Sequence, residues 1–149
     1  MKYLKLIALG LLIYSASASA ETIDVHLDGN LFAKIGTSNP VCGVLTLIKR
    51  NSGALVTGLT TANIELISVT ETAFSPTGSP FDRSINLTAS VTHTNTLGVY
   101  KLCLTPSRSS WPTDSGSALN LNPSYLVSGL VKAGPNDNGY FSATISSGN

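Results

Sequence analysis

Charged residues are scarce in this chain, and their scarcity narrows the range of partners. They make up 11% of its 149 residues, whereas about a quarter is usual in soluble proteins. Serine, threonine, asparagine and glycine stand in their place, a composition common among secreted β-proteins. The formal net charge is only +1, so nothing in the charge balance predicts binding to nucleic acid or to an anionic membrane.

Helical periodicity and long apolar runs are missing beyond the first twenty residues. No window of useful length there shows a 3.6-residue hydrophobic pattern, which argues against an α-helical fold. No apolar stretch there is long enough to cross a bilayer, so we expect no stable membrane insertion of the mature chain. The many serines include no Gly-x-Ser-x-Gly elbow and no acid–histidine arrangement. We therefore expect a protein that is not an enzyme and has no cofactor.

The N-terminal twenty residues have the pattern of a secretory signal peptide. Lys2 and Lys5 precede a short apolar run, and Ala18-Ser19-Ala20 supplies the small residues that a signal peptidase requires. We expect cleavage between Ala20 and Glu21. The alternative is an uncleaved anchor helix, but the apolar run is too short to span a bilayer. The protein is then expected in a periplasm or outside the cell.

The remaining residues, 21–149, have the length of one domain with its own core. Loss of two lysines leaves seven basic residues against eight acidic ones, a net charge of −1. The two cysteines of an exported chain predict one disulfide, between Cys42 and Cys103. Such a bond closes a loop of about sixty residues, for a nominal gain of roughly 4 kcal/mol. A pair of free thiols is the alternative, and no ligand spacing supports a metal site.

Alternation of apolar and polar residues predicts short β-strands separated by turns rich in Gly, Pro, Asn and Ser. This pattern indicates an all-β protein, an antiparallel β-sandwich of seven to eight strands. The segment 41–49 is apolar on both faces, which predicts a central strand. The expected strands are 22–27, 31–35, 41–49, 64–70, 85–92, 98–106, 125–133 and 140–146.

Several short motifs lie along these strands: Val56-Thr57-Gly58-Leu59 ahead of Ala62-Asn63-Ile64, Gly98-Val99-Tyr100 followed by Pro106 and Trp111, and Tyr125-Leu126-Val127. With the strand pattern, these motifs resemble a bacterial immunoglobulin-like domain of the invasin or fibronectin type. The resemblance covers most of residues 41–146. It implies an immunoglobulin-like β-sandwich over 21–149 and a role in binding or adhesion at a cell surface.

The position of the cysteines departs from antibody-type domains, where the bridge passes through the core between two sheets. Alternation places Cys103 on the face of Lys101 and Thr105, and it places Cys42 on the face opposite Leu47. We therefore predict a disulfide between neighbouring strands of one sheet, on its outer face. A β-bulge would shift this parity and reverse the prediction.

The long polar segment 106–123 holds the candidate binding residues, Trp111 and Asp114. An exposed tryptophan suits stacking on a carbohydrate or contact with a protein, so the expected partner is a protein or carbohydrate at a cell surface. In the alternative interpretation, Trp111 folds back and closes one end of the core. The sequence leaves both open.

Titratable residues elsewhere give weaker patterns. His26 and His93 are more simply exposed strand histidines than catalytic groups or metal ligands. Glu65 and Glu71 cannot be placed face to face, so a glycosidase-type carboxylate pair is unsupported. Asp137 between two asparagines offers oxygen atoms to calcium, but turn chemistry explains these residues as well. We expect no metal site.

Three hypotheses for function follow. The first is a secreted immunoglobulin-like module, not an enzyme, that binds at or outside the cell surface, an inference by analogy with the fold. The second is a pilin-like structural subunit of a surface fibre, in which a partner's strand fills a groove. The third is a small secreted inhibitor, which needs only a presented loop. Separately, Asn86-Leu87-Thr88 matches the acceptor pattern for N-glycosylation, a match that is frequent by chance.

Overall fold

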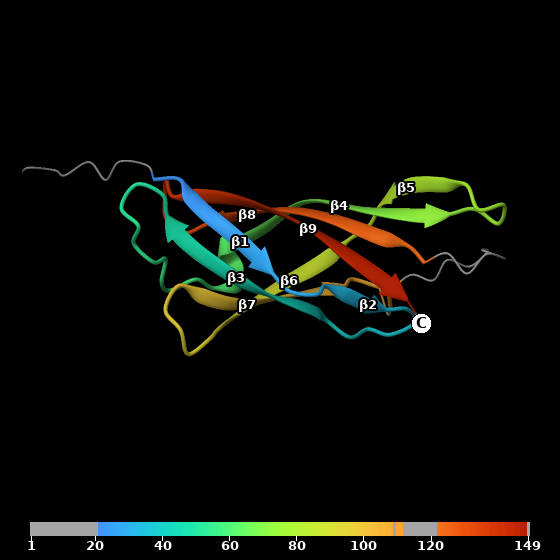
Figure 1. Ribbon diagram of the computed structural model, residues 1–149, viewed down its shortest axis with the longest axis horizontal. Helices are drawn as coiled ribbons and strands as arrows, with labels where there is room; N and C mark the ends of the chain where they lie inside the picture. Colours follow the sequence, from blue (N-terminus) through green and yellow to red (C-terminus); the bar gives the residue numbers. More distant parts are fainter. Residues whose placement is uncertain (1–20, 109, 112–121, 149) are drawn as a thin grey trace, which may run out of the picture.

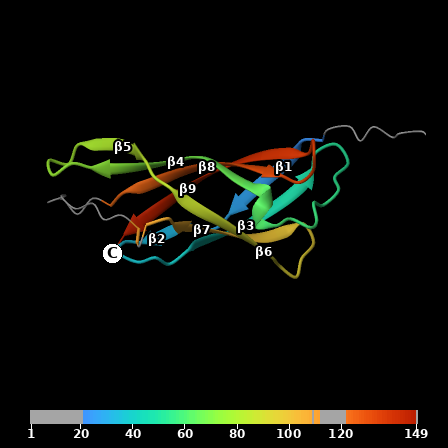
Figure 2. The ribbon, with the colours of Figure 1, turned by 180° about the vertical axis from the view of Figure 1, so that it is seen from behind.

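The computed structural model describes residues 21–108, 110–111 and 122–148, which form two packed β-sheets (Figures 1 and 2). In spatial order, the first sheet contains β1 (Ile23–Asp28), β3 (Val41–Lys49), β7 (Val99–Pro106) and β6 (Leu87–His93). The second contains β2 (Phe32–Lys34), β9 (Asn138–Gly148), β8 (Ser124–Lys132), β4 (Ile64–Phe74) and β5 (Pro80–Ser84). A 3₁₀ turn, η1 (Thr61–Asn63), leads into β4.

The core lies between the sheets and is built by residues two apart along each strand. On β7, Tyr100, Leu102 and Leu104 are buried, whereas Lys101 is exposed. On β3, Leu45 and Leu47 meet them from the neighbouring strand, as expected for a central strand. Burying such side chains contributes about 1.5–3 kcal/mol each. The two-sheet all-β fold expected from the alternation is therefore confirmed.

The strand pairing is not entirely antiparallel, contrary to the expectation. β2 pairs with the last strand, β9, in parallel, with Phe32 opposite Ser146. The chain leaves β1 at Gly29, whose φ is +136°, crosses to the other sheet and continues as β2. A side chain at Gly29 would meet the Cα atom of Gly43 at 3.3 Å. The first strand therefore divides between the sheets, which the local sequence pattern does not reveal.

The described residues form nine strands, one or two more than expected. The additional strand is β5, which returns from β4 through the loop at 75–79. Its sequence, Pro80-Phe81-Asp82-Arg83-Ser84, has no clear alternation and begins with proline, so it carries no strand signal. Because it lies at the edge of the second sheet, only one side of it needs a partner.

Candidate functional site

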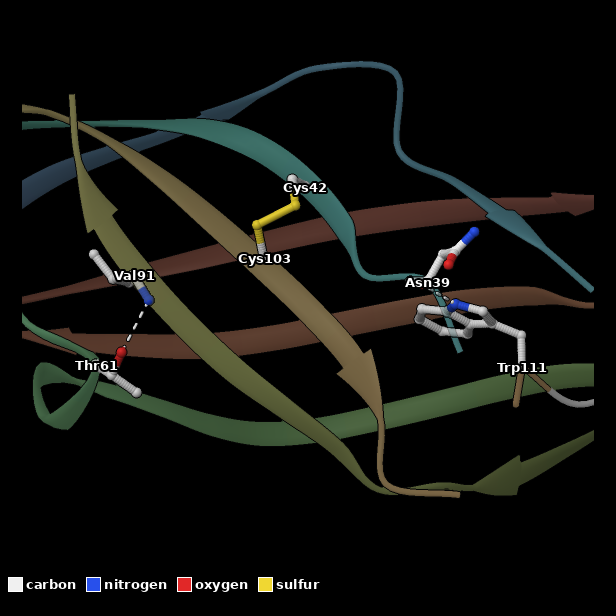
Figure 3. Close-up of a disulfide and its surroundings, with 6 residues drawn as sticks. All are labelled: Asn39, Cys42, Thr61, Val91, Cys103 and Trp111. Carbon is white, nitrogen blue, oxygen red and sulfur yellow. Dashed lines mark hydrogen bonds between the residues drawn. A yellow bond between two sulfur atoms is a disulfide. The ribbon is translucent and has the colours of Figure 1, made fainter. Parts of the chain in front are cut away.

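The disulfide joins Cys42 and Cys103, which stand directly opposite each other on β3 and β7 (Figure 3). Both cysteines are half-buried, and both share the outer face of the first sheet with the exposed Val44 and Lys101. The prediction of a bond within one sheet is confirmed. A disulfide fits an oxidising compartment.

Trp111 is buried, with 0% of its surface exposed. Its indole Nε1 donates a hydrogen bond to the carbonyl oxygen of Asn39 at 2.8 Å (Figure 3). Its backbone N–H donates to the carbonyl oxygen of Thr37, and its ring lies 5.2 Å from that of Tyr125. Trp111 thus closes one end of the core, and the hypothesis of an exposed stacking surface is wrong. Asp114 lies outside the described residues.

The other titratable candidates are dispersed. His26 and His93 lie on β1 and β6, at opposite edges of the first sheet. Glu65 is exposed and forms an ion pair with Lys132, whereas Glu71 is fully buried. Within the described ranges, no group of three or more His, Cys, Asp or Glu side chains could hold a metal ion.

Glu71 is a buried charged residue, and the alternation of the sequence did not predict its burial or its partner. It occupies an inward position of β4 and lies opposite Arg83 of β5, whose Nε donates to Glu71 Oε1 at 2.6 Å. Glu71 Oε2 has no hydrogen-bond partner among the described atoms. Tyr125 of β8 lies opposite Glu71 on its other side. Burial, and then the Glu71 carboxylate, raise the pKa of Tyr125 well above its usual range.

The two sheets have four edge strands; β2 and β5 are short, and β6 is contacted at one position by η1. β2 has three residues, and β5 has five and begins with proline, features that limit pairing with another chain. At the edge of β6, the Val91 N–H donates to the Thr61 hydroxyl of η1 at 2.9 Å (Figure 3). The edge of β1 is the one left to consider.

The outer edge of β1 presents backbone groups without a partner strand. The Arg50 N–H donates to the Thr22 carbonyl, and such paired positions alternate along an antiparallel ladder. Asp24 and His26 therefore bond to β3, whereas the N–H and C=O of Val25 and Leu27 project from the free edge. Beyond an isolated bridge between Thr22 and Asn138, no described strand pairs with this edge.

This edge opens into a groove of about 700 Å³ between β1 and the start of β9. Ile23 and Val25 supply apolar side chains, and the exposed ring of Tyr140 forms part of the other wall. Gly139 permits the close approach of the two strands. A Cβ atom there would lie 2.5 Å from the Ile23 carbonyl oxygen and from Val25 Cγ2.

The charged groups Asp24 and Arg50, which line the groove, and Lys49 and Asp137, which lie beside it, form pairs within the protein. Arg50 donates to Asp24 Oδ1 from Nε at 2.9 Å, and this hydrogen bond lowers the pKa of Asp24. Lys49 Nζ donates to Asp137 Oδ2 at 2.8 Å, which lowers the pKa of Asp137. Asp137 is thus already paired with a lysine, and the calcium interpretation of this turn has no support among the described residues. The groove therefore offers mainly backbone and apolar groups to its surroundings.

No family model, curated protein or solved structure matches this chain. In the part of the chain that the structure describes, no helix is long and apolar enough to span a bilayer.

Sequence reasoning named His26 but did not find the groove that it lines. Its walls come from residues more than 110 positions apart, such as Val25 and Tyr140. A strand pattern shows which side chains face inward, but it does not show which neighbour a strand lacks. The exposed Tyr140, at an outward position of a predicted strand, was the one local signal.

Proposed function

We propose that this chain is an exported immunoglobulin-like module that binds an extended segment of a partner protein along the free edge of β1. The observation that carries the proposal is the unpaired backbone of Val25 at the floor of a groove of about 700 Å³. An exposed strand edge binds extended peptides through main-chain hydrogen bonds, and adjacent pockets select their side chains.

The strand order supports the immunoglobulin-like assignment. Lettered in chain order with the divided first strand as A and A′, the sheets read A-B-E-D and A′-G-F-C-C′. The A-B-E-D group, and G-F-C extended by C′, are the sheets of immunoglobulin domains. Tyr125 lies near the start of strand F (β8), two residues before the buried Val127. In antibody domains a tyrosine occupies the same place, two residues before the second cysteine. The disulfide differs, because it joins B and E.

A binding site on β1 is favoured over a catalytic site because the groove offers no convergent reactive groups. Of its titratable side chains, Asp24 and Arg50 pair with each other, and Glu21 accepts hydrogen bonds from Ser52. His26 and Tyr140 complete the set. Tyr140 exposes 71% of its surface, and exposed aromatic rings are frequent anchors in protein interfaces. The partner is a protein strand, which can use both the aromatic ring and the backbone edge.

A display library of random peptides, selected against the oxidised protein, tests this proposal. Selected peptides should lose binding to the Val25→Pro variant, because proline removes the outward N–H without breaking the ladder to β3. They should also weaken against Tyr140→Ala. The matched control is Ala89→Pro at an outward-facing edge position of β6, which should bind normally. Peptides that bind Val25→Pro and the native protein equally would contradict the proposal.

Light scattering over a wide concentration range separates the fibre hypothesis from the binding module. A monomer at all concentrations supports a module whose partner is another protein and not a second copy of this chain. Growth into polymers that Val25→Pro abolishes would assign the same edge to a second copy of the chain, and so would contradict binding to a different protein.

A further inference from the structure

The disulfide between Cys42 and Cys103 lies outside the hydrogen-bond ladder that joins β3 to β7. The N–H of Leu47 donates to the carbonyl oxygen of Gly98 at 3.0 Å, and hydrogen-bonded pairs alternate with non-hydrogen-bonded pairs along an antiparallel ladder. Along the register from this pair, Cys42 and Cys103 form a non-hydrogen-bonded pair, in which side chains stand closer together. Opening the disulfide therefore removes no backbone hydrogen bond between the two strands.

The packing between the sheets does not depend on the two sulfur atoms either. Leu102 and Leu104, the chain neighbours of Cys103, point into the core, where each is 1% exposed. The cysteine side chain between them points to the opposite, outer face of the sheet. A reduced protein therefore keeps its ladder and its core, and it loses the constraint that the bond places on the unfolded chain.

The outer face of the first sheet leaves the disulfide within reach of molecules in solution. Both cysteines are half-buried. Ser90 of β6, which lies opposite Cys103, is small and exposed. On the other side of the bond, the register of β1 ends at Asp28, opposite Val44, and so stops short of Cys42. The ladder of β1 therefore does not extend past Cys42, where a thiolate can approach the sulfur atom.

A cation lies on the same face as the disulfide. Lys101 and Cys103 are two residues apart on β7 and therefore point to the same side of the sheet. The two carboxylates of this face, Asp24 and Asp28, belong to β1, and Asp24 is paired with Arg50. The other outward residues of β3, β7 and β6 are uncharged: Cys42, Val44, Thr46, Ile48, Val99, Thr105, Thr88, Ser90 and Thr92. Lys101 therefore attracts an approaching thiolate anion.

We propose that the Cys42–Cys103 bond is a site of thiol–disulfide exchange, which a dithiol opens while the protein stays folded and Lys101 accelerates the attack. A thiolate of the dithiol attacks one sulfur atom and forms a mixed disulfide, and the other cysteine leaves as a thiolate. The second thiolate of the dithiol then attacks the mixed disulfide and releases the remaining cysteine. The protein gains two electrons and, once both thiolates are protonated, two protons. The dithiol loses the same number of each and becomes a disulfide.

The rate of reduction by dithiothreitol, measured for the native protein and for the protein unfolded in concentrated urea, tests this access. Alkylation followed by mass spectrometry counts the free thiols at each time. The native protein should react within about tenfold of the unfolded rate, because the attack requires access to a sulfur atom and no unfolding. A bond that opened only through global unfolding would react more slowly by a factor of about 10³ or more, and this result would overturn the proposal.

The fold of the reduced protein is the second measurement. The circular dichroism spectrum and the fluorescence of the buried Trp111 should persist in excess dithiothreitol. Addition of oxidised dithiothreitol after removal of the reductant should restore the intramolecular bond in a monomer. A reduced protein that unfolds would overturn the proposal, because the bond would then be a requirement of the fold and not a site of exchange.

Substitution of Lys101 tests the charge on this face. Glutathione carries a net negative charge, so it should attack Lys101→Gln about two- to fivefold more slowly than the native protein, with the difference falling as salt is added. The matched control is Lys34→Gln, which removes an exposed lysine from β2 of the other sheet and should leave the rate unchanged. Equal rates for the native protein and Lys101→Gln would overturn the part assigned to Lys101.

Discussion

Cys42 and Cys103 are directly opposite residues of neighbouring antiparallel strands, and their Cα atoms are 4.0 Å apart. Their bond lies on the outer face of a sheet that hydrogen bonds and core packing already hold together. It therefore reinforces a strand pair and does not join the two sheets. Its main effect falls on the unfolded chain, in which it closes a loop between residues 61 positions apart.

Replacement of both cysteines by valine should leave the protein folded but less stable. We expect a loss of about 2–4 kcal/mol in the free energy of unfolding, from the loop-closure entropy that the bond removes. Valine suits a half-buried strand position. Urea unfolding followed by circular dichroism measures the loss, with the reduced native protein as control. An unfolded variant would show instead that the bond is needed for the fold itself.

Truncation of Trp111 should be among the most damaging single changes. Trp111→Ala removes a fully buried ring and should cost about 3–5 kcal/mol. Trp111→Phe keeps a ring against Tyr125 but loses the bond to the Asn39 carbonyl, so about 1 kcal/mol is expected. Because Trp111 is the only tryptophan, native fluorescence should resist quenching by iodide. Strong quenching would contradict its burial.

The Glu71–Arg83 pair should show a large asymmetry between single and double substitution. Arg83→Met leaves the Glu71 carboxylate buried without its cation, and we expect a loss of about 2–3 kcal/mol. A fully buried pair loses about 3–5 kcal/mol, but Arg83 is 39% exposed. Adding Glu71→Met should restore most of the stability. Chemical denaturation of the native protein, the two single variants and the double variant completes the cycle, and additive losses would contradict a direct coupling.

Asp137 should contribute to the loss of stability in acid. Its pKa is lowered, first by the hydrogen bond from Lys49 and then by that from the Glu21 N–H. A carboxyl whose pKa is lower when folded stabilises the protein above its unfolded pKa, about 3.9. That stabilisation disappears as the pH falls through the folded pKa. Urea midpoints of native protein and Asp137→Asn should therefore differ at pH 7 and converge as the pH falls below the unfolded pKa and through the lower, folded pKa.

Alternation was enough to predict most of the strands and the inner face of each. The burial of residues such as Leu87 and Ile145 could be predicted because each stands between two polar residues and side chains of a strand alternate between faces. The same parity placed Cys42 and Cys103 on the outer surface. No bulge intervenes on β3 or β7, so the inference from parity held.

Features that depend on distant segments could not be predicted in this way. Trp111 stands in a polar segment without periodicity. Only the three-dimensional structure shows that it donates a hydrogen bond to Asn39 and packs against the ring of Tyr125. Glu71 follows the inward parity of β4, but its cation comes from β5, a strand without a pattern of its own. The groove could not be predicted either, because the sequence does not show that β1 pairs with only one strand, β3.

The disulfide on the outer face also limits how far the protein can be extended by force. If tension acts at points near residues 22 and 146, the segment between Cys42 and Cys103 carries no load once the bond is reached. That segment covers 61 positions, so the oxidised chain reaches full extension about 200 Å sooner than the reduced chain. When pulled from both ends, the oxidised protein would thus keep in reserve nearly half of the extended chain length between residues 22 and 146, and only reduction would release it.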